Sequence, residues 1–329
     1  MSFRISPAWW PVLAVGSPVI VPLLLIRNRR FRQDRARAAE LNRARISQAG
    51  ALEMPELDYL ELTVLVEWKT EEGFIGDAAV SYLLKTGLGS MLYDVGRGPT
   101  HPALAHNAAK LGFHLDQVDA MAISHLHGDH MGGIPAQRSR QVTLPDALMS
   151  PQVKSCFLPD KAEAKGFKTE RVERPQLLTA GIASTGPLAR SLFRYGFTEE
   201  QALLARVKDK GLVVLTGCGH PTIEVVLEMV GRLSSEPLYA VGGGLHFPVT
   251  GGRVNRAGIQ VQTMIGTGKP PWQRITDEDL SRAISTINNA RPKRVYLSGH
   301  DTCDHALDRM TRELNAETEV LKAGATYRL

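Results

Sequence analysis

Cysteine is scarce in this chain of 329 residues, which contains only Cys156, Cys218 and Cys303. Three widely spaced cysteines do not make the disulfide framework of a small secreted protein, and they are compatible with a reducing compartment. Repeats and low-complexity segments are also missing after residue 50. The hydrophobic content of 43% is that of an ordinary globular protein, so the chain can bury a sizeable core.

Net charge is nearly absent from most of the chain, because the excess of basic residues lies at the N-terminal end. Nine arginines in residues 1–47 face Asp34 and Glu40, which leaves 30 basic and 32 acidic side chains for the rest. Nucleic-acid-binding proteins carry a basic footprint, and the larger part of this chain has none. We therefore expect a small-molecule substrate and no nucleic-acid partner.

Residues 8–26 contain no charged side chain and are long enough, as a helix, to cross the hydrocarbon core of a bilayer. Trp9 and Trp10 lie at one edge of this run, as interfacial aromatics do, and an arginine-rich stretch follows the other edge. The positive-inside rule then places the N-terminus outside and the following chain in the cytoplasm.

These observations predict a single-pass membrane protein with a cytoplasmic catalytic domain. The expected segments are a short tail at 1–7, a transmembrane anchor at 8–26, a basic linker at 27–57 and the catalytic domain at 58–329. The alternative is a hydrophobic arm that packs on the domain or on a partner. Three prolines inside the apolar run favour this alternative, because proline breaks helices: Pro11, Pro18 and Pro22.

The remainder of the chain alternates between strand-like and helix-like segments, which predicts an α/β fold built in layers. Strands are expected at 61–66, 79–84, 90–94, 118–124, 212–216, 238–242 and 294–298. Helices are expected at about 102–112, 198–209, 222–233, 277–289 and 304–315. Residues 134–190 are rich in proline, glycine and serine, and we expect long loops and short hairpins there.

Four of the expected strands run directly into a turn that holds a histidine. Strand ends at one edge of a packed sheet are a natural place for side chains to converge on a site. The four histidines are His125, His220, His246 and His300.

The sequence His125-Leu126-His127-Gly128-Asp129-His130 places four potential metal ligands in six residues. Imidazole is the commonest protein ligand of transition metals, and carboxylate also binds hard or borderline ions. On a tight loop these side chains can divide between two neighbouring ions, with the first two histidines on one ion and Asp129 and His130 on the other. Neither set is complete, so His220, His246 and His300 are the expected additional ligands.

At these residues the chain resembles the metallo-β-lactamase superfamily, whose fold is an αββα sandwich. Asp94 in Tyr93-Asp94-Val95-Gly96 is similar to the superfamily's early Asp-X-Gly turn, whose aspartate supports the metal loop. Later motifs resemble the branch that includes dihydropterin-ribofuranosylaminobenzene-phosphate synthase and its uncharacterised hydrolase relatives. These motifs are Ser184-Thr185-Gly186-Pro187, Thr216-Gly217-Cys218-Gly219-His220-Pro221, Gly243-Gly244-Leu245-His246 and Ser298-Gly299-His300.

The resemblance implies two metal sites. It assigns His125, His127 and His220 to the first site, and Asp129, His130 and His300 to the second. Lactamases and glyoxalase II-like thioesterases have a bridging aspartate on a later strand, which has no clear equivalent here, and His246 occupies roughly that place. Zinc is the expected ion, and iron and manganese accept the same His and Asp ligands.

We therefore expect a metal-dependent hydrolase in which a metal-activated hydroxide attacks an ester, lactone, amide or phosphoester. Asp129 is the expected catalytic residue, as ligand and proton acceptor. One alternative is a dihydropterin-ribofuranosylaminobenzene-phosphate synthase-like transferase, whose phosphate contacts would come from the basic loop 253–274. Another alternative is a membrane-tethered, non-catalytic metal-binding module.

Other polar residues fit simpler roles. Cys218 is expected to be a small buried residue rather than a ligand, and solvated loop charge explains Arg253, Arg256 and Lys269. The side chains that follow His300 are expected in the first turn of a helix: Asp301, Cys303 and His305. Histidines without ligand spacing are expected on a helix surface or in packing: His101, His106 and His114.

Overall fold

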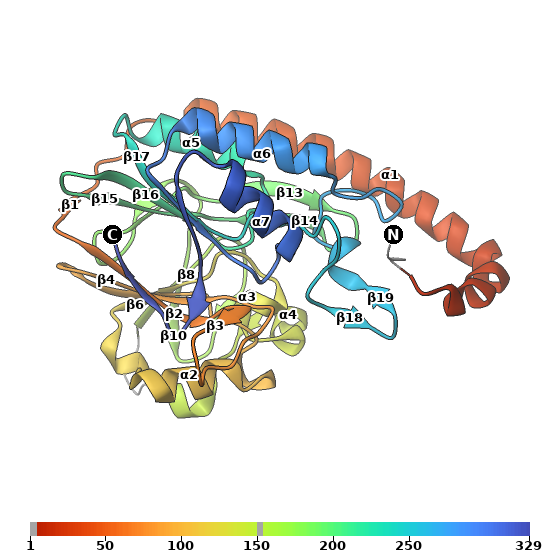
Figure 1. Ribbon diagram of the computed structural model, residues 1–329, viewed down its shortest axis with the longest axis horizontal. Helices are drawn as coiled ribbons and strands as arrows, with labels where there is room; N and C mark the ends of the chain where they lie inside the picture. The colour runs from red at the N-terminus through yellow and green to blue at the C-terminus, as the bar shows by residue number, and fades with distance from the viewer. Residues whose placement is uncertain (1–4, 150–153) are drawn as a thin grey trace.

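The computed structural model describes residues 5–149 and 154–329, and two β-sheets that face each other form its centre (Figure 1). The first sheet has the order β11-β12-β15-β16-β17-β20-β21, with β1 paired to β15. Its strands are β1 Glu56–Leu57, β11 Gln176–Leu177, β12 Ala183–Ser184, β15 Leu203–Val207, β16 Gly211–Thr216, β17 Leu238–Gly243, β20 Arg294–Leu297 and β21 Glu317–Val320.

The second sheet has the order β10-β8-β6-β5-β4-β2-β23. Its strands are β2 Leu60–Val66, β4 Ser81–Thr86, β5 Gly89–Tyr93, β6 Ala120–Ala122, β8 Lys154–Leu158, β10 Phe167–Arg171 and β23 Thr326–Arg328. Short pairs lie outside the two sheets: β3 Lys69–Thr70 with β22 Lys322–Ala323, β7 Gln141–Val142 with β9 Glu163–Ala164, β13 Leu188–Leu192 with β14 Gly196–Glu200, and β18 Asn255–Arg256 with β19 Ile259–Gln260.

Helices cover the outer face of each sheet, so the fold is the predicted αββα sandwich (Figure 1). The outer layer of the first sheet contains α1 Trp10–Gln48, α5 Ile223–Leu233, α6 Asp277–Ala290 and α7 Asp304–Glu313. The second sheet is covered by α2 Ala103–Leu111, α3 Gly128–Met131 and α4 Ile134–Ser139.

The main core lies between the sheets. Leu62 and Tyr82 of the second sheet and Leu203 and Val213 of the first belong to one cluster of buried side chains. Burying a leucine or valine side chain stabilises the fold by about 1.5–3 kcal/mol, so this layer holds the two sheets together.

The structure contains the seven expected strands and four of the five expected helices, but the helix expected at 198–209 is wrong. This segment forms the end of β14, two linking residues and β15. Its Glu, Gln, Ala, Leu and Arg residues favour a helix locally. Pairing of β15 with β12 and β16 overrides that preference, because it buries Leu203 and Val207 inside the sandwich.

Helix α1 is continuous from Trp10 to Gln48. The anchor expected at 8–26 and most of the linker expected at 27–57 therefore form a single helix. Its second half packs on the domain through Phe31, Ala38 and Ile46, which are buried. Asn42 fixes the contact, because its side-chain amide donates to the Ala189 carbonyl at 2.9 Å and its oxygen accepts from the Ala189 N–H at 2.7 Å. The second half of α1 is therefore part of the globular fold.

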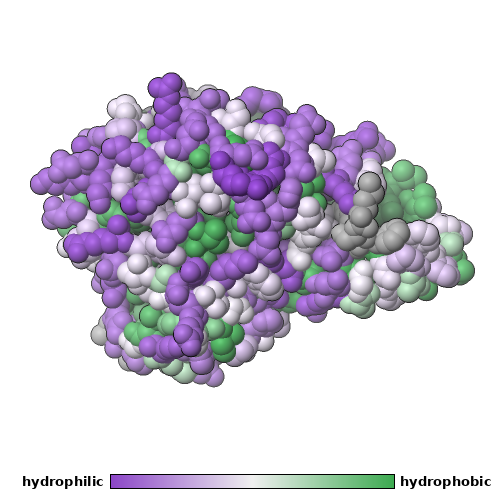
Figure 2. Space-filling model, viewed as in Figure 1, coloured by the Kyte–Doolittle hydropathy of each residue, from purple (hydrophilic) through white to green (hydrophobic). Residues whose placement is uncertain are grey.

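The first half of α1 extends away from the domain and exposes its apolar side chains, which form the green surface at the right of Figure 2. By length and composition this helix can cross a membrane. Residues before it contact the β18–β19 hairpin, where the Ser6 N–H donates to the Gly258 carbonyl and the Trp9 indole donates to the Ala257 carbonyl, both at 2.9 Å. Both ends of the apolar stretch thus touch the domain, and these contacts must open before the stretch can span a bilayer.

Candidate metal centre

The histidines converge because each follows a strand end at the same edge of the sandwich. His125 follows β6, and His220, His246 and His300 follow β16, β17 and β20, which are parallel neighbours. Parallel strands bring their carboxyl ends to one edge, as the sequence pattern predicts. The backbone of His246 has a φ of 57°, which places this side chain at the site at some conformational cost.

The first donor group consists of His125, His127 and His220, whose ligand atoms lie within 4.8 Å of one another. Nε2 of His220 is 3.1 Å from Nδ1 of His127. The Nε2 atoms of His125 and His127 are buried and have no hydrogen-bond partner among the described residues. Buried polar atoms without partners are costly, and a bound cation would satisfy both.

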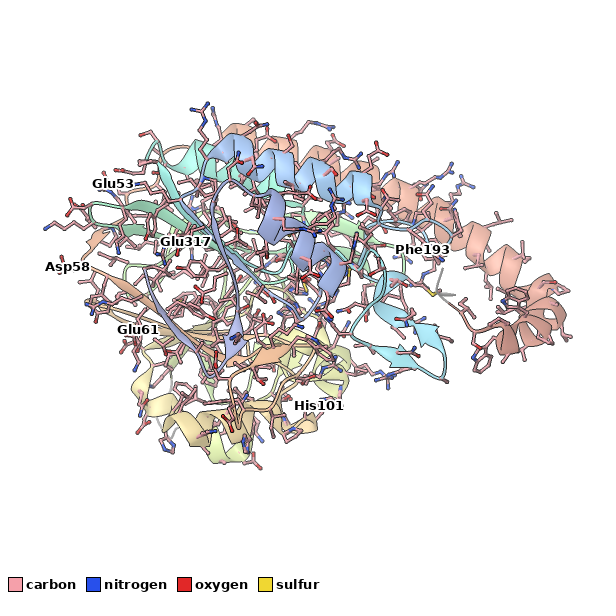
Figure 3. All side chains as sticks on the ribbon, viewed as in Figure 1. Glu53, Asp58, Glu61, His101, Phe193 and Glu317 are labelled. Atoms are coloured by element: carbon pink, nitrogen blue, oxygen red, sulfur yellow. The ribbon has the colours of Figure 1, made fainter. Side chains whose placement is uncertain are left out.

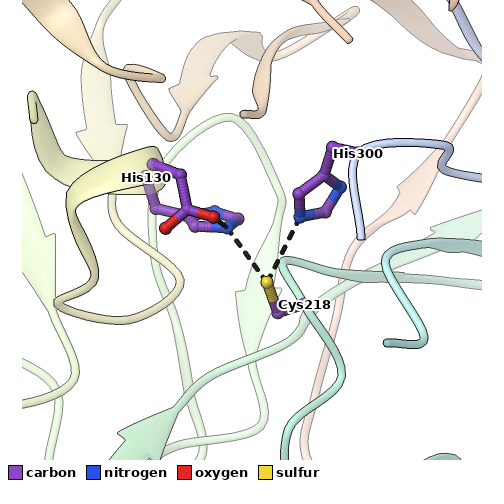
Figure 4. Close-up of side chains that lie close together, drawn as sticks. His130, Cys218 and His300 are labelled. Carbon is purple, nitrogen blue, oxygen red and sulfur yellow. Dashed lines mark hydrogen bonds and ion pairs between the residues drawn. The ribbon is translucent and has the colours of Figure 1, made fainter. Parts of the chain in front are cut away.

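The second donor group consists of Asp129, His130, Cys218 and His300, again within 4.8 Å. The Cys218 thiol lies 3.1 Å from Nε2 of His130 and 3.2 Å from Nε2 of His300 (Figure 4). Asp129 Oδ2 lies 3.8 Å from Nε2 of His130. The sequence pattern suggested that Cys218 is simply buried, and it is, but its sulfur faces the cluster.

His246 connects the two groups, because it shares a third donor set with Cys218 and His220. Both of its ring nitrogens are buried and without a hydrogen-bond partner in the described part of the chain. The nearby Asp301 carboxylate accepts from the His246 N–H at 3.0 Å and lies 3.7 Å from Nε2 of His300. Asp301 therefore holds the turn that carries His246. It precedes helix α7, whereas the sequence placed it in the first turn of this helix.

The residues after Asp301 lie away from the donor groups. Cys303 precedes α7 at its N-cap, and its sulfur accepts from the Thr250 hydroxyl at 3.4 Å. His305 is within α7 as expected and contacts Asp277 at 2.7 Å on the surface.

A hydrogen-bonded pair orients the metal loop. Asp94 Oδ2 lies 2.7 Å from Nδ1 of His130 and accepts from the Ser124 hydroxyl at 2.7 Å. Asp94 Oδ1 accepts from the Ser124 N–H at 2.6 Å, and the same hydroxyl lies 2.9 Å from Nδ1 of His125. These contacts fix the rings and leave Nε2 of each free to face the cluster, as outer partners of metal ligands do.

Two buried glutamates, which the sequence patterns did not identify, support the other ligands. Glu200 accepts from the backbone N–H groups of residues 217–220 at 2.8–3.1 Å and so holds the turn that carries Cys218 and His220. Glu67 accepts from the Ser298 hydroxyl, which lies 2.5 Å from Nδ1 of His300. Neither glutamate is in a recognisable motif, so only the packing of the chain reveals them.

His130 and Asp129 are both charged at neutral pH, whereas His127 and His246 are neutral. Burial alone would lower the pKa of His130, but Asp94 and Asp129 raise it to about 9. Burial would raise the pKa of Asp129, but the adjacent histidines lower it to about 2. Burial lowers the pKa of His127 and of His246 to about 4. The unprotonated imidazoles are ready to bind a cation without releasing a proton.

Of the basic residues in loop 253–274, Arg253 and Lys269 are held in ion pairs, in contrast to the solvated positions expected for them, whereas Arg256 is exposed as expected. Arg253 donates to the Gly299 and Thr302 carbonyls and pairs with Asp304 at 3.0 Å. Lys269 pairs with Asp279 at 2.5 Å. Both charges are thus tied to neighbouring elements rather than directed at the metal cluster.

The histidines that lack ligand spacing lie outside the donor groups, as the sequence suggested. His101 pairs with Asp77 at 3.1 Å on the surface, and His106 contacts the Gly73 carbonyl at 3.1 Å.

An aromatic side chain covers the first donor group from the β13–β14 hairpin. The Tyr195 ring lies against His127, with ring centroids 4.4 Å apart. Burial raises the pKa of Tyr195, and the charge of Asp129 adds to this effect. Its hydroxyl therefore stays protonated at neutral pH and can donate a hydrogen bond.

The metal loop lies within a segment that matches a known family model. Residues 75–143 match the model of the Metallo-beta-lactamase superfamily. A search of curated proteins found no match to this chain.

Solved structures resemble the chain over most of its length. Tm1679, described as a metal-dependent hydrolase of the beta-lactamase superfamily, is 22% identical, with a TM-score of 0.59 over 82% of this chain and 98% of that one. YhfI from Bacillus subtilis, a metallo-beta-lactamase fold protein, is 15% identical, with a TM-score of 0.49 over 83% and 100%. A diphosphatase from the PhnP family is 15% identical, with a TM-score of 0.46 over 82% and 97%. At such identities the similarity to Tm1679 informs about the fold and not about the substrate.

Proposed function

Because the chain has the metallo-β-lactamase fold, we propose that it is a metal-dependent hydrolase whose two adjoining donor groups hold two divalent ions. The observation that carries this proposal is the pair of donor groups at one edge of the sandwich, where ring nitrogens of His125, His127 and His246 are buried without a hydrogen-bond partner among the described residues. Binding sites for two ions within a few ångströms are typical of hydrolytic centres.

The donor chemistry fits two ions. His125, His127 and His220 would hold the first ion, and Asp129, His130, His300 and Cys218 the second, with His246 between them. Zinc suits this mixture of imidazole, carboxylate and thiol, whereas iron and manganese would rely on the His and Asp donors. When bound, such ions polarise the scissile group and lower the pKa of an attacking water.

The side chains around the ligands orient them for this chemistry. Asp94 and Ser124 hold His125 and His130, and Ser298 holds His300, so the ligand geometry is set before any substrate enters. Asp129 stays ionised at neutral pH because its pKa is about 2. We therefore assign it to charge neutralisation as a ligand first and to proton acceptance second.

We propose a small ester, lactone, amide or phosphoester as the substrate. The neutral phenol of Tyr195, which lies over His127, is placed to donate a hydrogen bond to a substrate oxygen. The transferase alternative, suggested by the resemblance to the dihydropterin-synthase-like branch, needs phosphate contacts from loop 253–274. The pairing of Arg253 and Lys269 leaves Arg256 and Arg274 as the exposed basic side chains of this loop, which reduces its capacity for phosphate contacts and favours the hydrolase.

We also propose that the first half of α1 associates with a membrane, with the catalytic domain on the cytoplasmic side. The support is an apolar helical stretch that is exposed in the folded chain and followed by arginines. Anionic lipid headgroups attract such arginines.

Metal analysis combined with a substrate panel tests the hydrolase. We expect about two ions per purified chain and turnover on at least one ester or phosphoester class. His127→Ala should lower the metal content and abolish turnover, whereas His101→Ala, a surface control outside the cluster, should change neither. A chain with less than one ion and no turnover on any class would instead be a non-catalytic metal-binding module. Retained turnover after complete metal removal would contradict the proposal.

A further inference from the structure

A pocket of about 280 Å³ lies between α1 and the loop around Trp272, outside the donor groups of the metal cluster. Phe31, Arg32 and Arg35 line it on the helix side, and Trp272 lines it on the loop side. Guanidinium groups bind phosphate through charge-assisted hydrogen bonds, and aromatic side chains pack against apolar chains. The lining therefore suits an anionic group carried on an apolar body.

The two arginines that line this pocket have no acidic partner among the described residues. Among the described residues, neither Arg32 nor Arg35 forms an ion pair, whereas Arg30 faces Asp34 at 4.0 Å on the same helix. Burial lowers the pKa of the nearby Arg190, and the charge of Arg35 lowers it further, whereas Glu224 and Asp279 act in the opposite direction. A bound anion would relieve this repulsion between guanidinium groups.

The pocket lies at the depth of lipid headgroups if the apolar half of α1 is in a membrane. The uncharged stretch ends at Ile26. Arg32 and Arg35 follow it by about 9 Å and about 14 Å along a helix. Headgroup layers extend roughly 5–8 Å beyond the hydrocarbon core, and long arginine side chains reach back toward that layer.

The β13–β14 hairpin connects this pocket to the metal cluster. Phe193, which is labelled in Figure 3, packs between two rings of the pocket lining. Its ring centroid is 5.7 Å from that of Phe31 in α1 and 5.5 Å from that of Trp272. Two residues further along this hairpin, Tyr195 lies against His127.

The loop makes a second connection, because the Gly266 carbonyl lies 3.1 Å from Nδ1 of His220 and Trp272 follows six positions later. Two separate segments thus join the pocket to the ligands of the first donor group.

We propose that this pocket binds the phosphate headgroup of an anionic membrane lipid at the rim of the metal site. The inference rests on the proposed membrane association of α1, and it requires no hydrolysis. Arg32 and Arg35 hold the phosphate, Phe31 and Trp272 contact the adjacent glycerol and acyl carbons, and the bound lipid lies beside the hydrolytic ligands.

Vesicle binding by the full chain tests the proposal. Vesicles of phosphatidylcholine alone are compared with vesicles that also contain phosphatidylglycerol, and the ratio of the two binding constants removes the contribution of the apolar helix. Arg32→Ala/Arg35→Ala is compared with Arg29→Ala/Arg30→Ala, which removes the same charge from the same part of α1 but leaves the pocket intact. We expect the pocket variant to lose about tenfold more of the preference for phosphatidylglycerol than the control does.

Trp272→Ala provides a charge-neutral test, and it should also reduce the preference. Equal losses in the two arginine variants, with no effect of Trp272→Ala, would show diffuse attraction and overturn the pocket. Binding of inorganic phosphate by the wild type and not by Arg32→Ala/Arg35→Ala, with no preference for phosphatidylglycerol vesicles in phosphate-free buffer, would identify free phosphate as the ligand and overturn the lipid assignment. Failure to bind either vesicle would overturn both the membrane association and the pocket, whereas binding both equally would overturn the pocket alone. His127→Ala should bind as the wild type does, which separates this result from the hydrolase.

Discussion

The thiol of Cys218 lies 3.1 Å from Nε2 of His130. Cys218 is on the turn after β16, which also carries His220. The sulfur belongs to the second donor group and also to the set that contains His220 and His246. It therefore lies, together with His246, between the two groups, where the sequence offers no bridging aspartate. A thiol beside a metal ion is deprotonated and becomes a ligand, although burial raises the pKa of the free Cys218 thiol.

Cobalt substitution tests this role of Cys218. Cobalt(II) bound by a thiolate has a sulfur-to-metal charge-transfer absorption, which nitrogen and oxygen ligands do not produce. We expect the cobalt-loaded protein to show this band. Cys218→Ser should lose the band, and it should bind the second ion more weakly than the wild type does. The three histidines of the first group should still bind one ion in the variant.

Cys303→Ser is the matched control, because Cys303 is buried but contacts Thr250 rather than a ligand. It should keep both the band and the metal content. A band that persists in Cys218→Ser would show that Cys218 serves only in packing.

The sequence predicted the fold and the convergence of the histidines because both depend on local patterns. The loop at 125–130 and the strand-end turns that hold His220, His246 and His300 are each recognisable within a few residues. Parallel pairing of β16, β17 and β20 then brings the three turns to one edge.

The supporting residues could not be predicted in this way, because their roles arise from contacts between distant segments. Glu67 reaches Ser298 across the sandwich, although the two are 231 positions apart in sequence. The helix expected at 198–209 failed for the same reason, since pairing of β15 with β12 and β16 decides its structure. The role of α1 in the globular fold also depends on a distant contact, between Asn42 and Ala189.

Asp94→Asn should weaken metal binding without unfolding the protein. The carboxylate uses both oxygens, one for Ser124 N–H and one for His130 and the Ser124 hydroxyl, whereas an amide has only one acceptor. Asparagine tolerates the φ of 62° found at this position. We expect the dissociation constant of the metal to rise about 10- to 100-fold. Competition with a chromogenic chelator measures it, and Asp119→Asn, an exposed control, should leave it unchanged.

The two buried imidazoles of His127 and His246 should make the metal-free protein less stable as the pH falls from about 6.5 to about 4, whereas buried carboxyl groups such as Glu67, whose pKa burial raises to about 7, act in the opposite direction. Burial lowers the pKa of His127 and of His246 to about 4, so in this window the unfolded chain binds protons that the folded chain excludes. Each such histidine contributes a slope of up to about 1.4 kcal/mol per pH unit. Urea unfolding at several pH values in the presence of a chelator measures the slope, and His127→Asn should reduce it.

His130 does not oppose this trend, because its pKa is raised to about 9. Its stabilising contribution is complete below the unfolded value near 6.5 and is lost only as the pH rises through 9. A dependence of the free energy of unfolding on pH that is the same in His127→Asn as in the wild type would contradict the assignment of neutral, buried imidazoles.

Two truncations should separate the apolar half of α1 from the half that belongs to the domain. A chain that begins at Arg27 keeps Phe31, Ala38 and Ile46 buried against the domain. We expect this shorter chain to be soluble and as stable as the full chain. A chain that begins at Gln48 loses these side chains, and we expect its free energy of unfolding to fall by about 5 kcal/mol. Urea unfolding of both compares the two halves directly. Equal stability would mean that the second half of α1 does not contribute to the fold, and membrane retention of the shorter helix would place the membrane contact elsewhere.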